Sequence, residues 1–318
     1  MARKDKITRR GLGMLVAGAA LLAATGSSLA QERVAYKSAK AGSSYYQMGV
    51  QLAEALKGSD IQLTIEESQG SVQNVAESAV RPGAYVFTSP PGLVGAATRA
   101  AGPFEGKGNP KFDEIRALFP IPSLTMHVVT RADAGVETFD DLRGKTLLLG
   151  KGSFGAREGA KYLDMFGVAD EVEVADAELS NAVAALKNGR IDGFVTAGSY
   201  PAPNVIEAAA STGVNVLSMT DDQIAETKRT RLVIPAGTYA GQDEDVVTTS
   251  LPVVAFTTTA MSDDTAYALT KAYWEAKDDL GGAAAWWKGV TPDMIGNVST
   301  GVHPGAKRYY EEIGVDTE

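Results

Sequence analysis

The chain has 318 residues, a formal net charge of −9, two histidines and no cysteine. The lack of cysteine excludes disulfides, zinc–thiolate sites, iron–sulfur clusters and a thiol nucleophile, and two histidines that stand far apart in the sequence are too few for a histidine-rich metal site. The acidic balance argues against nucleic acid and anionic membranes as partners. The length suits one large or two medium-sized domains.

Residues 1–30 have the pattern of an export signal. A basic start that ends at Arg10 is followed by a stretch without charge, which closes on Ser28-Leu29-Ala30, a small-x-small cleavage pattern. Arg9-Arg10 resembles a twin-arginine signal, with ordinary secretion and an uncleaved membrane anchor as alternatives. We expect cleavage after Ala30, which leaves a soluble periplasmic protein with 25 basic and 38 acidic residues and a net charge of −13.

Short apolar strands alternate with helical segments through the rest of the chain. The predicted strands span residues 33–36, 62–66, 85–88, 126–130, 146–150, 171–174, 193–196, 214–218 and 253–257. The predicted helices span residues 46–56, 72–78, 91–100, 156–166, 181–187, 203–211, 221–228, 263–276 and 306–312. This alternation predicts an α/β fold with largely parallel sheets.

Two glycine- and serine-rich turns lead into predicted helices about 110 residues apart, one before residue 46 and one at Gly150–Gly155. Each is followed by a unit of helix, glycine and strand, which favours two similar lobes, each with its own sheet; chance similarity of short α/β units is the alternative. In open α/β sheets such turns lie at the carboxyl ends of the strands. Two facing lobes would therefore form a cleft into which helix N-termini point, which suits an anion.

The second turn also admits an enzymatic interpretation. Gly150-x-Gly152-x-x-Gly155 fits the dinucleotide-binding fingerprint, and Asp176 stands where a ribose-binding acid would. An exported NAD(P)-dependent oxidoreductase is therefore the alternative function. It is less favoured because the motif occurs in mid-chain, no convincing acid pair with a His or Lys–Tyr follows it, and a tight strand-to-helix turn already needs glycine.

From about Val34 to its end, the chain resembles the TAXI family of solute receptors for tripartite ATP-independent periplasmic (TRAP) transporters. The motifs that carry the resemblance span residues 42–46, 69–74, 102–104, 186–194, 234–245 and 303–310. The resemblance implies a two-lobed periplasmic receptor that closes on a small organic anion or amino acid and delivers it to a sodium-driven TRAP permease. It implies no chemistry on the ligand; we expect no cofactor, no nucleic acid and a monomer.

We place lobe 1 at residues 31–125 and 252–318 and lobe 2 at residues 126–251, joined by two crossing segments. Backbone N–H groups and neutral hydroxyls are expected to hold the ligand's carboxylate, with Tyr45 or Tyr46 as an apolar wall and the other facing the core. The candidate ligand-binding residues are Gly42, Ser43, Ser44, Tyr45, Tyr46, Ser71, Asn74, Thr88 and Ser89 in lobe 1, and Ser153, Phe154, Gly155, Ala156, Arg157 and Tyr200 in lobe 2.

This sequence departs from the family pattern at two places. Relatives commonly have Gln-Ser-Asp where this chain has Thr88-Ser89-Pro90, and Ser-Gly-Thr where it has Ser153-Phe154-Gly155. Phe154 is expected to shrink the pocket or to favour a ligand with an apolar portion. Arg157, which is outside the usual pattern, could supply a positive charge, with a solvated surface arginine as the alternative. Tyr200 is a further candidate, with packing alone as its alternative.

Overall fold

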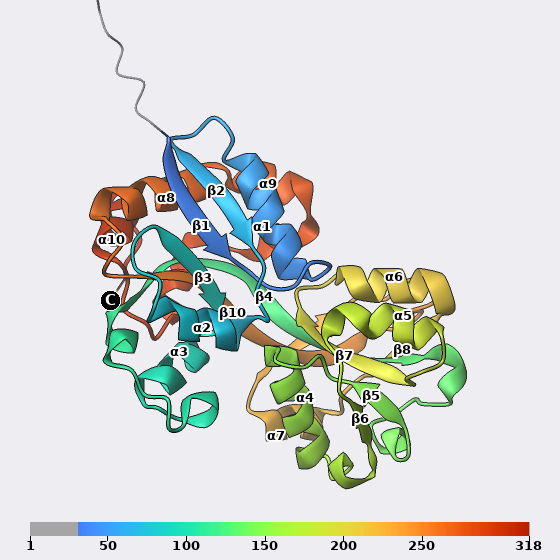
Figure 1. The fold of residues 1–318 in the computed structure, drawn as a ribbon. Coiled ribbons are helices and arrows are strands. Elements are labelled where there is room, and N and C mark those ends of the chain that lie inside the picture. Colours follow the sequence, from blue (N-terminus) through green and yellow to red (C-terminus); the bar gives the residue numbers. More distant parts are fainter. Residues whose placement is uncertain (1–30, 318) are drawn as a thin grey trace, which may run out of the picture. The chain divides into compact units, whose positions relative to one another are not determined.

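The computed structural model describes residues 31–317, so the predicted export signal lies outside the described residues (Figure 1). Within residues 31–317, no helix is long and apolar enough to cross a membrane. The strands are β1 (Glu32–Lys37), β2 (Ile61–Glu66), β3 (Tyr85–Ser89), β4 (Ile115–Arg131), β5 (Thr146–Leu148), β6 (Glu173–Ala175), β7 (Gly193–Gly198), β8 (Val214–Val216), β9 (Thr230–Ile234) and β10 (Val246–Thr258). The α-helices are α1 (Ser44–Ala55), α2 (Ser71–Ser78), α3 (Pro91–Thr98), α4 (Phe154–Met165), α5 (Ala182–Lys187), α6 (Pro203–Thr212), α7 (Asp221–Thr227), α8 (Asp263–Glu275), α9 (Lys277–Ala283) and α10 (Pro304–Glu312).

The strands form two halves that share the long strands β4 and β10. Hydrogen bonding follows the order β2-β1-β3-β10-β4-β7-β5-β6, with β8 beside β4 and β9 beside β10. The first half has β1–β3, α1–α3 and α8–α10, and the second has β5–β9 and α4–α7. Pairing is parallel among β1, β2 and β3 and among β5, β6 and β7, as the α/β pattern predicts.

The two long strands connect the halves (Figure 1). Residues 115–121 of β4 pair antiparallel with residues 253–258 of β10, which also pair with β3. Residues 125–131 of β4 pair with β7 and β8, and residues 246–250 of β10 pair with β9. The two long strands still pair with each other at Leu124 with Leu251 and at Thr125 with Ser250. The expectation of a separate sheet in each lobe is therefore wrong, because the crossing segments are themselves strands that hydrogen-bond to each other.

Two hydrophobic clusters lie against these strands. The larger surrounds β1, β3, β4 and β10 and includes Phe119, whose ring stacks on Tyr273 with centroids 4.0 Å apart. The smaller lies between β7 and helices α5 and α6 and includes Phe194. Burying one side chain of this size stabilises the folded state by about 1.5–3 kcal/mol. The two clusters therefore hold the strands in place, and the ends of these strands carry the residues of the site.

Candidate functional site

A small cavity, which we name the inner cavity, lies where the two halves meet. Its volume is about 50 Å³, measured for the centre of a water-sized sphere. That space suits a carboxylate group or a few water molecules and is far too small for a dinucleotide. The first half and the crossing strands contribute Ser38, Ala39, Lys40, Ser43, Tyr45, Gln69, Gly70, Ser71, Thr88, Leu124 and Val253, and the second half contributes Lys151, Ser153, Phe154, Gly155, Leu179 and Ala197.

Three helices begin at this cavity. Ser43 caps α1, and its Oγ accepts a hydrogen bond from the Tyr46 N–H at 3.2 Å. Ser153 caps α4 in the same way, accepting from the Ala156 N–H at 2.9 Å. The helix α2 begins at Ser71, whose hydroxyl makes no hydrogen bond within residues 31–317. None of these helices has an acidic residue in its first turn, so their partial positive charge is left for an external anion.

The turns before α1 and α4 have the same geometry, which supports the internal similarity seen in the sequence. Ser43 N–H donates to the Lys40 carbonyl at 3.1 Å, and Ser153 N–H donates to the Gly150 carbonyl at 3.0 Å. The third residue of each turn is glycine with a positive φ, 85° in Gly42 and 78° in Gly152. A side chain disfavours this backbone conformation, so glycine is needed at both turns.

Tyr45 and Thr88 form buried walls of the cavity. The Tyr45 hydroxyl donates to the Pro122 carbonyl at 3.1 Å, which holds the ring against the crossing strand β4. Burial raises the pKa of Tyr45, so the phenol stays neutral. Thr88 lies at the end of β3 and is 4% exposed. Both side chains can therefore face a ligand without adding charge.

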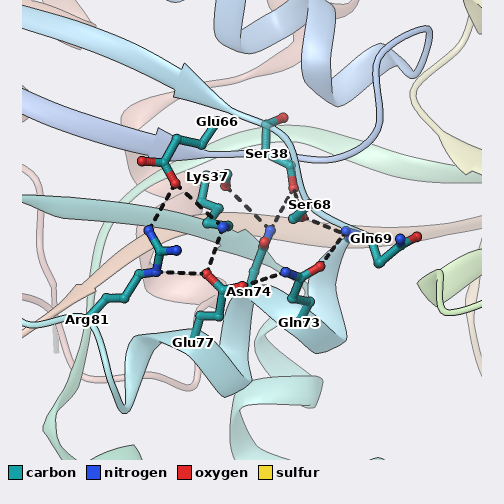
Figure 2. Close-up of polar contacts among 10 residues, drawn as sticks. Lys37, Ser38, Glu66, Ser68, Gln69, Gln73, Asn74, Glu77 and Arg81 are labelled. Atoms are coloured by element: carbon teal, nitrogen blue, oxygen red, sulfur yellow. Dashed lines mark hydrogen bonds and ion pairs between the residues drawn. The ribbon is translucent and has the colours of Figure 1, made fainter.

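Asn74 supports the site from behind (Figure 2). It is 1% exposed and does not line the inner cavity. Its Nδ2 donates to the Ser38 carbonyl at 2.7 Å and to the Thr88 carbonyl at 3.0 Å. One amide thus ties α2 to the ends of β1 and β3. Its place behind the wall gives Asn74 a structural role that the sequence does not distinguish from ligand contact.

A charged network continues this support along α2 (Figure 2). Gln73 accepts from the Gln69 N–H at 2.7 Å and donates to Glu77. Glu77 lies 2.7 Å from the buried ammonium of Lys37 and 3.1 Å from Arg81. Burial raises the pKa of Glu77, but the hydrogen bonds from Lys37 and Gln73 outweigh it and leave this pKa below its usual value. The network fixes the backbone of the Gln69 loop at the cavity.

Charged residues that the sequence reasoning missed lie at the edge of the cavity. Glu178 of the second half accepts from Gln69 Nε2 at 2.9 Å and pairs with Lys40 Nζ at 3.2 Å, both in the first half. These hydrogen bonds, that from Gln69 first, lower the pKa of Glu178. Lys151 pairs with Asp176 at 2.9 Å. The lysines stand beside the recognised turns, but their partners are distant in sequence.

Seven of the fifteen sequence-predicted residues line the inner cavity: Ser43, Tyr45, Ser71, Thr88, Ser153, Phe154 and Gly155. Their contact with a ligand stays a prediction. The other eight are Gly42, Ser44, Tyr46, Asn74, Ser89, Ala156, Arg157 and Tyr200, and none of them lines this cavity.

These eight residues have other positions or partners. The Ser44 hydroxyl donates across the halves to the Ser199 carbonyl at 3.1 Å, and the Ser89 hydroxyl donates to the carbonyl of the next residue at 3.1 Å. Gly42 is exposed, Tyr46 is half-buried, and Ala156 meets the Ser153 cap through its N–H. Tyr200 lines a different cavity with Pro122 and Trp286, and Arg157 lines a larger cavity described below.

Comparison with known proteins places this geometry in a family. A family model described as the NMT1-like family matches residues 37–314. Among solved structures, MatC from Rhodopseudomonas palustris with bound malate aligns with a TM-score of 0.56 at 15% identity, covering 88% of this chain and 96% of that one. The periplasmic binding protein BugD aligns with a TM-score of 0.57 at 10% identity, covering 89% and 98%. A periplasmic transporter structure aligns with a TM-score of 0.56 at 12% identity, covering 88% and 93%.

These likenesses show the fold, and the two-lobed α/β fold of periplasmic binding proteins is confirmed. The expectation of a binding protein and not an enzyme agrees with both the family and the fold. The turn Gly150–Gly155, on which the oxidoreductase alternative rested, caps α4 and contributes Lys151, Ser153, Phe154 and Gly155 to the inner cavity.

Proposed function

The protein belongs to the NMT1-like family, and from that membership and its periplasmic-binding-protein fold we propose that it is an exported receptor for a small organic anion. The observation that carries the proposal is the meeting of three helix N-termini, none with an acid in its first turn, at one small cavity between the halves. Such an arrangement holds a carboxylate through N–H groups and hydroxyls without a bound cation.

Histidine, the side chain most often used as a general acid or base, is absent from the lining of the cavity. Of the two histidines, neither lines it. His127 is buried elsewhere, with its Nε2 2.8 Å from the Tyr239 hydroxyl, and burial lowers its pKa to about 4. His303 caps α10. Capture and release of the ligand, without conversion, is the function that this arrangement supports.

We further propose the finer assignment that the TAXI resemblance implies. The receptor would act in the periplasm as a monomer and deliver its ligand to a sodium-driven TRAP permease. Lobes at residues 31–125 with 252–318 and at residues 126–251 would close on the ligand. The bound malate in the similar MatC structure makes carboxylates the first ligands to test. A TRAP permease gene beside the gene for this protein would support the partner, and an ABC-type permease gene there would contradict it.

A ligand screen tests the proposed function. The purified protein is scanned by thermal shift against small carboxylates, amino acids, NADH and NADPH, and each hit is titrated by calorimetry. A ligand that binds only the folded state stabilises it by about 2.7 kcal/mol at a concentration one hundred times its Kd. We expect at least one small carboxylate to raise the Tm and both nucleotides to leave it unchanged. Binding of a nucleotide with micromolar affinity, or no response to any carboxylate or amino acid, would contradict the proposal.

A further inference from the structure

A second and larger cavity, which we name the outer chamber, adjoins the inner cavity at Phe154. The Phe154 side chain lines both. The outer chamber has a volume of about 610 Å³ on the same measure, against about 50 Å³ for the inner cavity. Its walls come from both halves and include Leu93 of α3 and Leu251 of β10. A ligand longer than one carboxylate group therefore has more room toward the outer chamber than toward the cavity of about 140 Å³ that shares Lys40, Ser43 and Leu179 with the inner cavity.

The outer chamber carries a surplus of positive charge in an acidic protein. Its charged lining residues are Arg157, Lys161, Arg229 and Glu158. Glu158 is buried and already neutralised by Arg229, whose Nε lies 2.7 Å from its carboxylate. Arg157 and Lys161 are exposed and make no hydrogen bond or ion pair with any residue in the described part of the chain. Two cations are thus available to an anion in this chamber.

Helix α4 connects the two cavities. Ser153, Arg157 and Lys161 are spaced four residues apart, so they follow one face of the helix from the inner cavity to the outer chamber. Four residues of helix rise about 6 Å, which is a spacing that a short dicarboxylate can bridge. The Arg157 side chain also crosses toward the first half, because its Nη2 lies 3.6 Å from the position that a Cβ on Gly102 would occupy.

We propose that the outer chamber is a subsite for a second acidic group, so that the receptor's substrate class is an organic dianion. One carboxylate lies in the inner cavity, the middle of the ligand lies against the Phe154 ring, and the second acidic group meets Arg157 and Lys161. This inference rests on the proposed function, since it assumes that the inner cavity holds the first carboxylate. Charge-assisted hydrogen bonds to the two cations would then distinguish a dianion from a monoanion of equal length.

The test compares matched ligands on matched variants. Calorimetry measures the Kd of butyrate against succinate, hexanoate against adipate, and benzoate against terephthalate. The proteins are the wild type, the variant Arg157→Gln with Lys161→Gln, and a control with Lys187→Gln and Arg190→Gln. The control removes the same charge from exposed cations of the second half that line neither cavity. The Tm of each variant shows that it is folded.

We expect the dianion of at least one pair to bind the wild type at least ten times more tightly than its monoanion. That advantage should fall to less than threefold in the Arg157 and Lys161 variant and persist in the control. Monoanions that bind as tightly as dianions in every pair would overturn the subsite while leaving the proposed function standing. Equal weakening of both ligand types in the variant would also overturn it, because the cations would then only attract anions in general. If no carboxylate binds any of the proteins, the proposed function itself fails.

Discussion

The inner cavity and the outer chamber share one lining phenylalanine, yet they offer different groups to an anion. The inner cavity offers helix N-termini and hydroxyls, and the lysines at its edge are already paired with Glu178 and Asp176. The outer chamber is larger and holds two cations, Arg157 and Lys161, that have no ion-pair partner among residues 31–317. Directed N–H groups fix the position of an anion, whereas long cationic side chains adapt to it. On the proposed function, this difference assigns the orientation of the ligand to the inner cavity and the selection for its charge to the outer chamber.

The helices of this protein differ in the charge of their first turn. The helix α7 has Asp221 and Asp222 in its first turn, and α8 has Asp263 and Asp264. These acids complement the dipoles of their own helices, as is common in soluble proteins. The helices α1, α2 and α4 lack such acids, as do α3, α5, α6 and α10. The first three are distinguished by beginning at the inner cavity, where an external carboxylate can take that place.

The largest loss of carboxylate affinity is expected when an acidic side chain is introduced into the inner cavity. The substitution Ser71→Asp places a carboxylate in the first turn of α2, where it favours the helix but repels a bound anion. Two like charges about 4 Å apart cost about 4 kcal/mol at the effective dielectric constant of a protein surface. Carboxylate affinity should fall at least about a hundredfold, while the Tm stays unchanged or rises. Asp222→Ser in α7 is the control and should leave the affinity at its wild-type value; unchanged affinity in Ser71→Asp would exclude the inner cavity as the site.

Two neutral substitutions in α2 should separate ligand contact from support. Ser71→Ala removes an unpaired hydroxyl of the inner cavity and should weaken carboxylate binding by about 1–3 kcal/mol at constant Tm. Asn74→Ala removes the amide that ties α2 to Ser38 and Thr88, and should lower the free energy of unfolding by about 1–3 kcal/mol. Urea denaturation and calorimetry on both variants make the comparison. If Asn74→Ala had wild-type stability but bound carboxylates more weakly, Asn74 would be a ligand contact and not a structural support.

Salt should act on the outer chamber more than on the inner cavity. Arg157 and Lys161 are exposed, so dissolved salt screens their charges. The Debye screening length falls from about 10 Å at 0.1 M salt to about 3 Å at 1 M. Raising the salt concentration should therefore reduce the preference for a dianion by roughly three- to tenfold while changing monoanion affinity little. Calorimetry with adipate and hexanoate at several sodium chloride concentrations measures both trends. Equal salt dependence for the two ligands would contradict the division of roles.

The smallest effect is expected at the contact between the halves. Glu178 bonds to Gln69 and Lys40 across the edge of the inner cavity, but its side chain is 41% exposed. Exposed pairs of this kind contribute about 0–1 kcal/mol, so Glu178→Gln should weaken ligand binding by no more than about fivefold. Asp176→Asn, which removes a pair within the second half, is the matched control. A loss of more than tenfold in Glu178→Gln alone would show that closure of the halves depends on this contact.

Much of the fold could be predicted from the sequence because its signals are local. The turns at Gly42 and Gly152 and the alternation of strands and helices need only neighbouring residues. The full length of the crossing strands was missed because Pro120, Pro122 and Pro252 interrupt them, and proline is unfavourable inside a strand. The sequence does not predict β9, because its first two residues are exposed, only Ile234 at its end is buried, and it pairs only with β10.

The site was predicted in part for the same reason. Residues inside the recognised turns, such as Ser43 and Ser153, line the inner cavity, and their contact with a ligand stays a prediction. Whether Asn74 faces the cavity or the strands depends on the positions of Ser38 and Thr88, which helical spacing alone does not give. The ion pair between Lys40 and Glu178 joins residues 138 positions apart in the printed sequence. No local pattern predicts such a pair, because it forms only when the chain folds.

A crystal structure of the protein with the tightest-binding carboxylate of the matched series tests the central claim most directly. The account predicts one carboxylate in the inner cavity, with its oxygens about 2.7–3.2 Å from N–H groups at the starts of the helices and from the Ser71 hydroxyl. For a dianion, the second acidic group should lie beyond Phe154, beside Arg157. A structure in which the inner cavity contains only water while the carboxylate binds elsewhere would contradict the account.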